Sequence, residues 1–533
     1  MAVIDALLAL RAAASACAAA ASSTGFSAEQ AANGQAVMDM LSGIFVPRAA
    51  IMSGAALEPE AHLLTLLPSE IMTSILHRLD TFALFRFAST CRALYRHAPA
   101  SIVAVTLQER AAIRGCSVAG PPEGAQGGVP YLLRREWQHT LLDRNPLAAG
   151  ESSVFIDPSG RLLTCGTEGI DHDDPGPLSA WVLATADPDH EAEMRYLATP
   201  TVVPGLSDVS FRGIAASAHG CVAVCRDEGK VYSWGFAGGQ LGQDEDHCSA
   251  EVDGLAGVRV RSVDLGCSSL SSVFAAVTEQ GELYTWGSVL IEDGTEGQNG
   301  IGYPVDGQYV ETPRQVIISG VCIRSVALGY GFSLILATDG RLFSCGQVLS
   351  GALGHGPAEP DVVRPKQIEA LQGVRVCGMA AGFANSLALT SAGLVYSWGY
   401  APGTGLGLTD YGARLLPTVV EALAGVRVSM VAAGGDHACA VSEDGELFTW
   451  GSDGRYGSLG HGDEAAQPAP RRVEALRGCR IAVVSTGEYH TLAAGEGGSV
   501  YGFGLSSRLG LGIVSHESQL TPVRIPNLKV WLG

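Results

Sequence analysis

The sequence contains 533 residues, of which 47% are hydrophobic, and its formal net charge at pH 7 is -20. A chain of this length exceeds what one ordinary hydrophobic core encloses, so two or more modules are expected. The acidic balance argues against nucleic acid and anionic membrane surfaces as partners, because both require clustered cations. No apolar stretch of about 18 residues suggests a membrane span.

The 13 cysteines show no metal-binding or redox spacing, and no Cys-x-x-Cys occurs. Cys221 and Cys225 lie four residues apart on a predicted strand, where we expect them to be buried as small apolar residues. This usage fits a reduced intracellular compartment, the cytoplasm or the nucleus. It predicts no metal and no cofactor.

Residues 1–60 form an alanine-rich N-terminal extension that we expect to be partly disordered or helical. Residues 1–23 are rich in alanine and serine and carry Arg11 with a single acid, Asp5. This composition also fits an organellar transit peptide. A frayed alanine-rich helix is the favoured interpretation, because a further module follows.

Residues 61–100 change character and predict three short helices. The run Leu66-Leu67-Pro68-Ser69-Glu70 places a proline in the first turn of a helix, where its missing N–H does no harm. Apolar residues then recur at helical spacing as far as Leu79, and two further short helices follow, ending near Tyr95. Three helices of this size cannot enclose so many large apolar side chains, so a partner should cover part of them.

This segment resembles an F-box, and the interval from Ile75 to Cys91 matches the spacing usual in that family. Leu94 stands where the family often has tryptophan, and Ala83 where it often has aspartate, but neither change removes the apolar face. The resemblance implies docking on a Skp-type adaptor that connects to a cullin and RING ubiquitin ligase, with the ubiquitin chemistry carried out elsewhere. The residues that it implies at the adaptor interface, some of which must also hold the F-box together, are Leu66, Leu67, Pro68, Ile71, Ile75, Leu76, Leu79, Leu84 and Phe85.

Residues 101–146 join the two modules. A run rich in glycine and proline, residues 120–128, predicts a flexible linker. Residues 131–142 predict a short helix, which Trp137 and Leu141 could pack against the first unit of the following module.

From residue 147 to residue 533 one hairpin recurs, which is the sign of a repeat protein. A typical copy has a small-residue entry (Ala380-Ala381-Gly382), an alternating apolar strand, a two-residue turn and a return strand ending in an aromatic–glycine pair (Trp398-Gly399). A glycine-rich loop and a proline-led segment complete it, so four short strands per repeat are expected. The turn glycines, spaced 52 to 69 residues apart, are Gly160, Gly229, Gly281, Gly340, Gly393, Gly445 and Gly498.

Repeats of this kind cannot bury their apolar faces alone, so they must stack, and closing the stack into a ring protects the strand edges. Seven repeats predict a mainly β fold, a seven-bladed β-propeller preceded by the small three-helix F-box. The first repeat opens directly at Ala148-Ala149-Gly150, and the last ends on the proline-led strand Pro522 to Ile525. We therefore expect the C-terminal strand to complete the first blade and lock the ring.

The repeat pattern resembles the regulator of chromosome condensation (RCC-type) family, with motifs covering residues 147 to 528 in seven matches. That resemblance implies a seven-bladed propeller. The founding member exchanges nucleotide on a Ran-type small GTPase and binds chromatin; chromatin binding is disfavoured here by the acidic charge. Another relative is a UV-B photoreceptor, but its tryptophan-rich repeats are absent from this sequence.

No enzyme motif is present: there is no phosphate loop, no Gly-x-Ser-x-Gly elbow and no His-Glu-x-x-His. No catalytic residues are therefore expected. His437 and His490 occupy equivalent repeat positions, so a structural role is expected for both.

Acidic residues collect in the loops that follow the aromatic–glycine pairs of the first three repeats, and these loops should emerge on one face of the ring. One interpretation is a solvated, solubilising surface; the hypothesis we advance is the capture of a substrate segment that is basic. Adjacent acids in one loop cannot easily converge on a metal ion. The candidate substrate-face acids are Asp171, Asp173, Asp174, Asp244, Asp246, Glu292 and Asp293.

The chain contains only three lysines, Lys230, Lys366 and Lys529, within a total of 34 lysines and arginines. Lysine scarcity would limit self-modification of a receptor beside an active ligase, and biased codon usage explains it equally well. Together the two resemblances predict the substrate-recognition subunit of a Skp-cullin-F-box type ubiquitin ligase, not itself an enzyme, whose propeller binds an unidentified substrate protein. Nucleotide exchange on a Ran-like GTPase and a non-catalytic scaffold remain alternatives.

Overall fold

The computed structural model describes most of the repeat region. The described residues are 145–150, 153–166, 197–203, 205–217, 220–235, 249–268, 271–288, 301–304, 309–347, 351–357, 362–400, 406–408, 412–452, 456–506 and 518–530, with residues 106, 107, 110, 132, 134, 135, 137, 138, 141, 142, 509 and 532. They belong to two units that separate between residues 140 and 141. The F-box segment lies outside the described residues, as do all the acids proposed for the substrate face.

The described part of the second unit forms seven four-stranded antiparallel sheets, each one blade of a propeller. Every sheet takes four consecutive strands of the chain in order, so each blade is one repeat. The strands of blades 1 to 3 are β1 (Leu147–Ala149), β2 (Ser153–Ile156), β3 (Leu162–Gly166), β4 (Leu197–Val202), β5 (Phe211–Ala216), β6 (Gly220–Cys225), β7 (Val231–Gly235), β8 (Ser249–Glu251), β9 (Val260–Ser268), β10 (Ser271–Thr278), β11 (Leu283–Ser288) and β12 (Tyr309–Val316).

Blades 4 to 7 repeat the same plan with greater regularity. Short 3-10 helices follow the fourth strand in three of them: η2 (Glu369–Leu371), η3 (Glu421–Leu423) and η5 (Glu474–Leu476). The strands are β13 (Ile323–Leu328), β14 (Phe332–Ala337), β15 (Leu342–Gly346), β16 (Val362–Gln367), β17 (Val376–Ala381), β18 (Asn385–Thr390), β19 (Val395–Gly399), β20 (Arg414–Val419), β21 (Val428–Ala433), β22 (His437–Ser442), β23 (Leu447–Gly451), β24 (Gln467–Arg472), β25 (Ile481–Thr486), β26 (His490–Gly495), β27 (Ser499–Leu505) and β28 (Ser518–Lys529).

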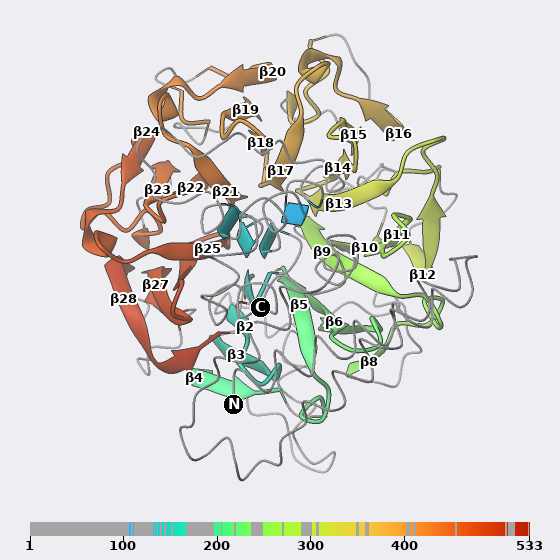
Figure 1. Ribbon diagram of the computed structural model, residues 1–533, viewed down its shortest axis with the longest axis horizontal. Coiled ribbons are helices and arrows are strands. Elements are labelled where there is room, and N and C mark those ends of the chain that lie inside the picture. The colour runs from blue at the N-terminus through green and yellow to red at the C-terminus, as the bar shows by residue number, and fades with distance from the viewer. Residues whose placement is uncertain are drawn as a thin grey trace, which may run out of the picture. The chain divides into compact units, whose positions relative to one another are not determined.

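The first strand of each blade lies near the axis of the ring and the fourth lies at its periphery, as the positions of β17 and β20 illustrate (Figure 1). Because neighbouring strands are antiparallel, the loops between strands one and two and between strands three and four emerge at the same end of a blade. We call this end the loop face. The opposite end, which we call the hairpin face, carries the turns between strands two and three and the connections to the next blade.

The hairpin-face turns confirm the repeat predicted from glycine spacing. All seven turn glycines have φ between 68° and 92°, the left-handed region that side chains with a Cβ rarely adopt. At Gly445, for example, a Cβ would also lie 2.9 Å from Cα of Arg480 in the next blade. Glycine is therefore required there both for the turn and for the approach of the neighbouring blade.

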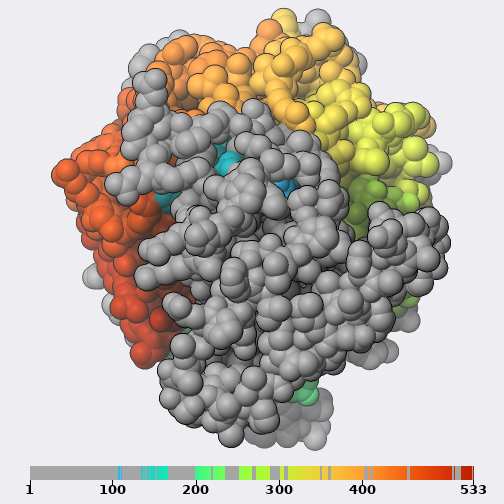
Figure 2. Space-filling model, in the orientation of Figure 1, coloured from blue at the N-terminus to red at the C-terminus, as the bar shows by residue number. Residues whose placement is uncertain are grey.

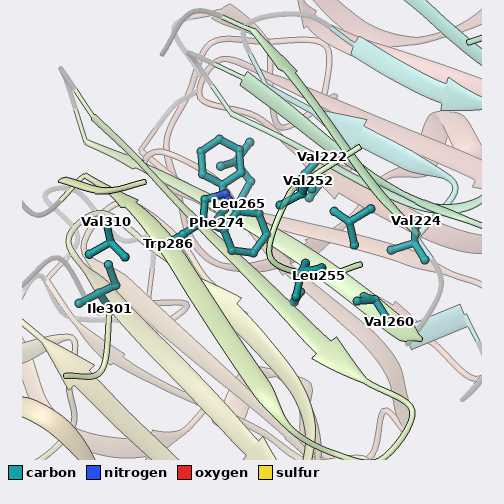
Figure 3. Packing of buried hydrophobic residues seen from close by; sticks show 13 residues of the cluster. Val222, Val224, Val252, Leu255, Val260, Leu265, Phe274, Trp286, Ile301 and Val310 are labelled. Atoms are coloured by element: carbon teal, nitrogen blue, oxygen red, sulfur yellow. The ribbon is translucent and has the colours of Figure 1, made fainter. Parts of the chain in front are cut away.

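Blades pack face to face through large apolar side chains. Trp286 of β11 stacks on Phe274 of β10 with ring centroids 5.4 Å apart, inside a cluster that also takes Val222 and Val224 from blade 2 (Figure 3). Trp234, Trp286, Trp398 and Trp450 are each at most 1% exposed. Packing between blades therefore accounts for all four aromatic–glycine tryptophans, as expected.

The cysteines on the second strand of blade 2 behave as the sequence predicts. Cys221 and Cys225 are both buried in β6 and carry free thiols. Burial raises the pKa of Cys221 to about 12, so the thiol stays protonated at neutral pH. Among the described residues no helix is long and apolar enough to cross a membrane.

The predicted closure of the ring by the C-terminal strand is wrong. β28, which contains Pro522 to Ile525, pairs with β27 in the seventh blade, and β4 supplies the fourth strand of the first blade. The proline-led strand of the first repeat does exist, at Pro200, but the long insertion after Gly166 separates it from its hairpin. Since every repeat supplies its own four strands, neither end of the array lacks a strand for the other to provide.

The ring closes instead by packing of blade 1 on blade 7. Strand β1 lies against β25, and the Ala149 N–H donates a hydrogen bond to Ser485 Oγ at 3.2 Å. The buried side chains of Ser153 and His490 are hydrogen-bonded, Oγ to Nε2, at 3.0 Å. First and last blades are thus joined by contacts of β1 with β25 and β26 and by hydrogen bonds to side chains, without an exchanged strand.

Candidate partner-binding face

Hydroxyl and imidazole side chains recur at equivalent positions where blades or loops meet. His437 Nε2 is hydrogen-bonded to Thr491 Oγ1 of the next blade at 2.9 Å, and His490 makes the equivalent contact with Ser153. Both imidazoles are fully buried, and burial lowers the pKa of His437 to about 4, so it is neutral at physiological pH. These histidines hold neighbouring blades together, as their repeat positions predicted.

A second histidine position supports the loops within single blades. Ser344 Oγ is hydrogen-bonded to His355 Nε2 at 2.9 Å, and Thr449 Oγ1 to His461 Nε2 at 3.0 Å. The same two hydroxyls lie within 2.7 Å of the Leu353 and Leu459 carbonyls, to which they donate. Their role is again structural. Among the described residues no group of three or more His, Cys, Asp or Glu could hold a metal ion.

On the loop face of blades 4 to 7, the turns between the first and second strands form a continuous arc. The Tyr330 N–H donates to the Gly382 carbonyl at 3.3 Å, and the Phe383 N–H to the Gly434 carbonyl at 3.2 Å. The Gly435 N–H in turn donates to the Gly487 carbonyl at 3.4 Å. Each turn is therefore held against that of the next blade, which fixes the relative positions of the residues that follow the entry glycines Gly329, Gly382, Gly434 and Gly487.

Aromatic side chains stand along this arc. The rings of Tyr330 and Phe383 lie with centroids 4.1 Å apart, and those of Tyr456 and Tyr489 with centroids 4.7 Å apart. Phe383 is 49% exposed, and the neighbouring Tyr400, whose N–H donates to the Ala384 carbonyl, is 43% exposed. Exposed rings held on a fixed backbone are typical of surfaces that bind another protein.

Two carboxylates lie on the same arc. Asp436, in the sixth blade, is half-buried, and burial raises its pKa above the usual aspartate value. Glu488, in the seventh blade, is exposed. Within the described part of the chain, neither carboxyl makes an ion pair or a hydrogen bond, in contrast to Asp463 on the same face, which lies 3.7 Å from Arg471. We call Tyr330, Phe383, Tyr400, Asp436, Tyr456, Glu488 and Tyr489 the loop-face arc.

The sequence-predicted site residues and the loop-face arc do not overlap. The predicted acids belong to loops of blades 1 to 3 that lie outside the described residues, so their grouping stays a prediction. The sequence did not predict the arc because its residues are of several different types. A usable signal was nevertheless present, since Tyr330, Phe383 and Glu488 each follow the glycine that ends a repeat entry.

In the space-filling view, blades 3 to 7 run from yellow-green at the right edge to red at the left edge (Figure 2).

The fold defines a repeat propeller, and its loop face carries the exposed ring of Phe383 and the exposed carboxyl of Glu488. Residues 250–532 match the model of the RCC1-like domain, and residues 64–102 match the F-box-like model. The chain belongs to the RCC1-like domain family and carries an F-box-like domain ahead of the propeller. Both resemblances inferred from the sequence are thereby confirmed.

Three curated proteins are similar in sequence to part of this chain. The ultraviolet-B receptor UVR8 of Arabidopsis thaliana is 34% identical over 318 residues, which cover 58% of this chain and 69% of that protein. The mitochondrial RCC1 domain-containing protein RUG3 of A. thaliana is 32% identical over 61% of this chain and 72% of its own length. The human E3 ubiquitin-protein ligase HERC2 is 34% identical, but the match covers 56% of this chain and only 6% of HERC2.

Solved structures agree on the fold. Yeast Prp20p from Saccharomyces cerevisiae, described with its binding properties to Gsp1p and histones, superimposes with a TM-score of 0.58 at 21% identity, over 73% of this chain and 89% of Prp20p. Human WBSCR16 gives a TM-score of 0.55 at 22% identity over 65% of this chain and 90% of its own. At this identity the likeness establishes a shared propeller and nothing further about activity.

Proposed function

We propose that the chain is the substrate-recognition subunit of a Skp-cullin-F-box type ubiquitin ligase, with the propeller binding the substrate protein. The observation that carries this proposal is the joining of an F-box-like segment, residues 64–102, to an RCC1-like propeller in one chain. The F-box would dock on a Skp-type adaptor and through it on a cullin. The loop-face arc would hold the substrate.

The propeller contributes recognition and no chemistry in this proposal. The described histidines that could serve as acid or base are committed to contacts between and within blades. The arc offers aromatic rings and carboxylates on a rigid backbone, which suits recognition of a protein segment. The ubiquitin-ligase activity in the name of HERC2 belongs to a protein of which this chain matches only 6%, so that activity is not carried over to this chain.

The test is affinity purification of the intact chain beside two variants. Pro68→Ala with Ile75→Ala alters the F-box, and Phe383→Ala with Tyr400→Ala alters the exposed rings of the propeller. We expect the unaltered chain and the propeller variant to recover a Skp-type adaptor and a cullin, and the F-box variant to lose both. Equal adaptor recovery by the F-box variant, with its fold intact by circular dichroism, would contradict the proposal.

Nucleotide exchange is the second candidate, because Prp20p shares the fold and is described with binding to Gsp1p. The same purification discriminates between the two. Recovery of a Ran-like GTPase in place of the adaptor, released by added GTP, would favour exchange over the receptor function.

A further inference from the structure

The residues that lead from the linker into the first blade make contacts with two blades other than their own. The Asn145 carbonyl accepts a hydrogen bond at 3.1 Å from the Ile214 N–H of β5, in blade 2. The Leu142 side chain lies against β17, in blade 5, where its Cδ1 is 3.6 Å from the position that a Cβ on Gly378 would take. Leu141, which precedes it, is only 3% exposed. The entry to the ring is therefore held by the first strands of two different blades.

Blades 2 and 5 are as far apart as two blades can be in a ring of seven sheets. Their first strands, β5 and β17, lie on opposite sides of the axis (Figure 1). Only three Cα–Cα steps separate Leu142 from Asn145, and they span about 11 Å at most. Sheets that pack face to face stand about 10 Å apart, so a path along the inner wall past blades 3 and 4 is on the order of 20–30 Å. The chain can reach both strands only by crossing the axis.

A glycine provides the place where Leu142 rests. Gly378 is the third residue of β17, directly after a register shift between this strand and its neighbour, and Gly213 holds the same place in β5. Neither has a positive φ, so neither glycine is required for its backbone conformation. Among the described residues nothing lies within 4 Å of a Cβ built on Gly213, whereas a Cβ on Gly378 would meet Leu142 and Leu389. A larger side chain at position 378 would therefore press on Leu142, and the same side chain at position 213 would stand in open space.

We propose that residues 141–145 act as an axial strap, which anchors the N-terminal part of the chain with its F-box-like domain to the first strands of blades 2 and 5. The strap lies toward the hairpin face, because β1 begins at that end of its blade. Apolar burial of the two leucines and the backbone hydrogen bond to Ile214 hold it. A substrate segment is then held on the loop face without threading through the ring. This inference goes beyond the proposed function and does not depend on it.

The experiment measures amide hydrogen exchange of the full-length chain at Ile214, whose N–H is protected by the Asn145 carbonyl. Leu142→Ala should speed this exchange about five- to tenfold, because the strap leaves the ring more often when its apolar contact with β17 is lost. Leu416→Ala is the matched control, since it makes the same change at a leucine of β20 that is 46% exposed, and it should change the rate less than about twofold. Equal rates in Leu142→Ala and the unaltered chain overturn the proposal.

A second amide in the same sample reports on the ring itself. The Val428 N–H donates to the Gly393 carbonyl at 3.1 Å across the boundary between blades 5 and 6, far along the chain from the strap. Its exchange rate should be the same in the unaltered chain and in Leu142→Ala. Equal acceleration at Val428 and Ile214 would mean that the substitution loosens the whole propeller, and it overturns the assignment of a strap.

The two equivalent glycines give an independent test from the side of the ring. With exchange at Ile214 expressed relative to the intrinsic rate of each sequence, Gly378→Val should reproduce the acceleration seen in Leu142→Ala, and Gly213→Val should stay within about twofold of the unaltered chain. Equal effects of the two valines would show that bulk on a first strand, and not the loss of the Leu142 contact, exposes Ile214, which overturns the proposal. Leu142→Ala should still recover the Skp-type adaptor, so the strap and the proposed function fail separately.

Discussion

Ser153 in the first blade and His490 in the seventh are hydrogen-bonded at 3.0 Å, and this buried contact lies at the seam where the ring closes. The equivalent contact between His437 and Thr491 joins blades 6 and 7. The seam is thus built like an ordinary boundary between blades, with Ser153 at the position that Thr491 holds in the seventh repeat.

Removing the hydroxyl at the seam should destabilise the whole propeller. Ser153→Ala leaves the buried His490 Nε2 without its partner, which costs about 1–3 kcal/mol. Urea unfolding should show the loss as a lower midpoint. Thr418→Ala is the control, because the Thr418 hydroxyl donates to Leu416 on an exposed strand and should cost under about 0.5 kcal/mol. An unchanged midpoint for Ser153→Ala would show that the hydrogen bond between Ser153 and His490 adds nothing to the closure of the ring.

Mild acid should weaken the propeller through His437. Burial lowers its folded-state pKa to about 4, below its usual 6.5, so the unfolded chain binds the extra proton between these two values. Stability contributed by the neutral imidazole is therefore present above pH 6.5 and falls as the pH drops toward 4, by on the order of 2 kcal/mol between pH 7 and pH 5. In urea unfolding at both pH values, the free energy of unfolding of His437→Gln should fall less between pH 7 and pH 5 than that of the unaltered chain. An equal fall in the two proteins would mean that His437 is not held neutral.

The pH dependence of stability contributed by Asp264 should have the opposite sign to that of His437. Burial raises its pKa to about 6, while its carboxyl accepts the Leu328 N–H at 2.7 Å. A raised folded-state pKa means that stability is present below the usual aspartate value and falls as the pH rises through 6. Asp264→Asn should therefore lose less stability than the unaltered chain between pH 4.5 and pH 7. A steeper loss in the variant would contradict the burial of this carboxyl.

Gly445, one of the seven turn glycines, and Gly425, in the turn that follows η3, separate backbone strain from crowding. Gly445 and Gly425 have φ of 82° and 85°, but only Gly445 has a neighbour within reach of an added Cβ. Gly425→Ala should cost about 1–2 kcal/mol for the left-handed conformation. Gly445→Ala should cost about 1–3 kcal/mol more, because the methyl meets Arg480 of the next blade. Thermal unfolding of both proteins measures the difference, and equal losses would show that the blades shift apart without penalty.

The three lysines share one end of the propeller, which bears on self-modification. Lys230 precedes the third strand of blade 2, and Lys366 and Lys529 lie near the ends of β16 and β28, so all three are toward the hairpin face. Lys230 is also paired with Glu228 at 3.0 Å and Glu251 at 3.3 Å. The described part of the loop face therefore carries no lysine, which under the proposed receptor function would limit self-modification on the face that holds the substrate.

New lysines on opposite faces test this placement. Glu464→Lys adds one on the loop face, and Glu421→Lys makes the same charge change in η3 on the hairpin face; both positions are exposed. In a reconstituted ligase we expect Glu464→Lys to raise self-ubiquitination severalfold and Glu421→Lys to leave it unchanged. Equal modification of the two would leave biased codon usage as the explanation for lysine scarcity.

The sequence predicted the blade almost residue by residue because the four strands of a blade are consecutive in the chain. Asp339-Gly340 and Trp398-Gly399 report a turn and a packing residue whose requirements are met within one repeat and its neighbour. The closure failed as a prediction because the first repeat is split by a long insertion, which hid Pro200 from the pattern. Both ends of the repeat array then looked incomplete and complementary, which suggested a strand exchange. The hydrogen-bond pairing of β3 with β4 excludes that exchange.

What the sequence determined by itself is the number of repeats, the four strands of each and the F-box-like segment ahead of them. These depend on the spacing and periodicity of residue types, which the sequence contains directly. Only the tertiary structure decided how the ring closes and which loops meet on one face. Phe383, Gly435 and Glu488 are 52 or 53 residues apart and become neighbours because closing a ring of sheets brings equivalent turns side by side.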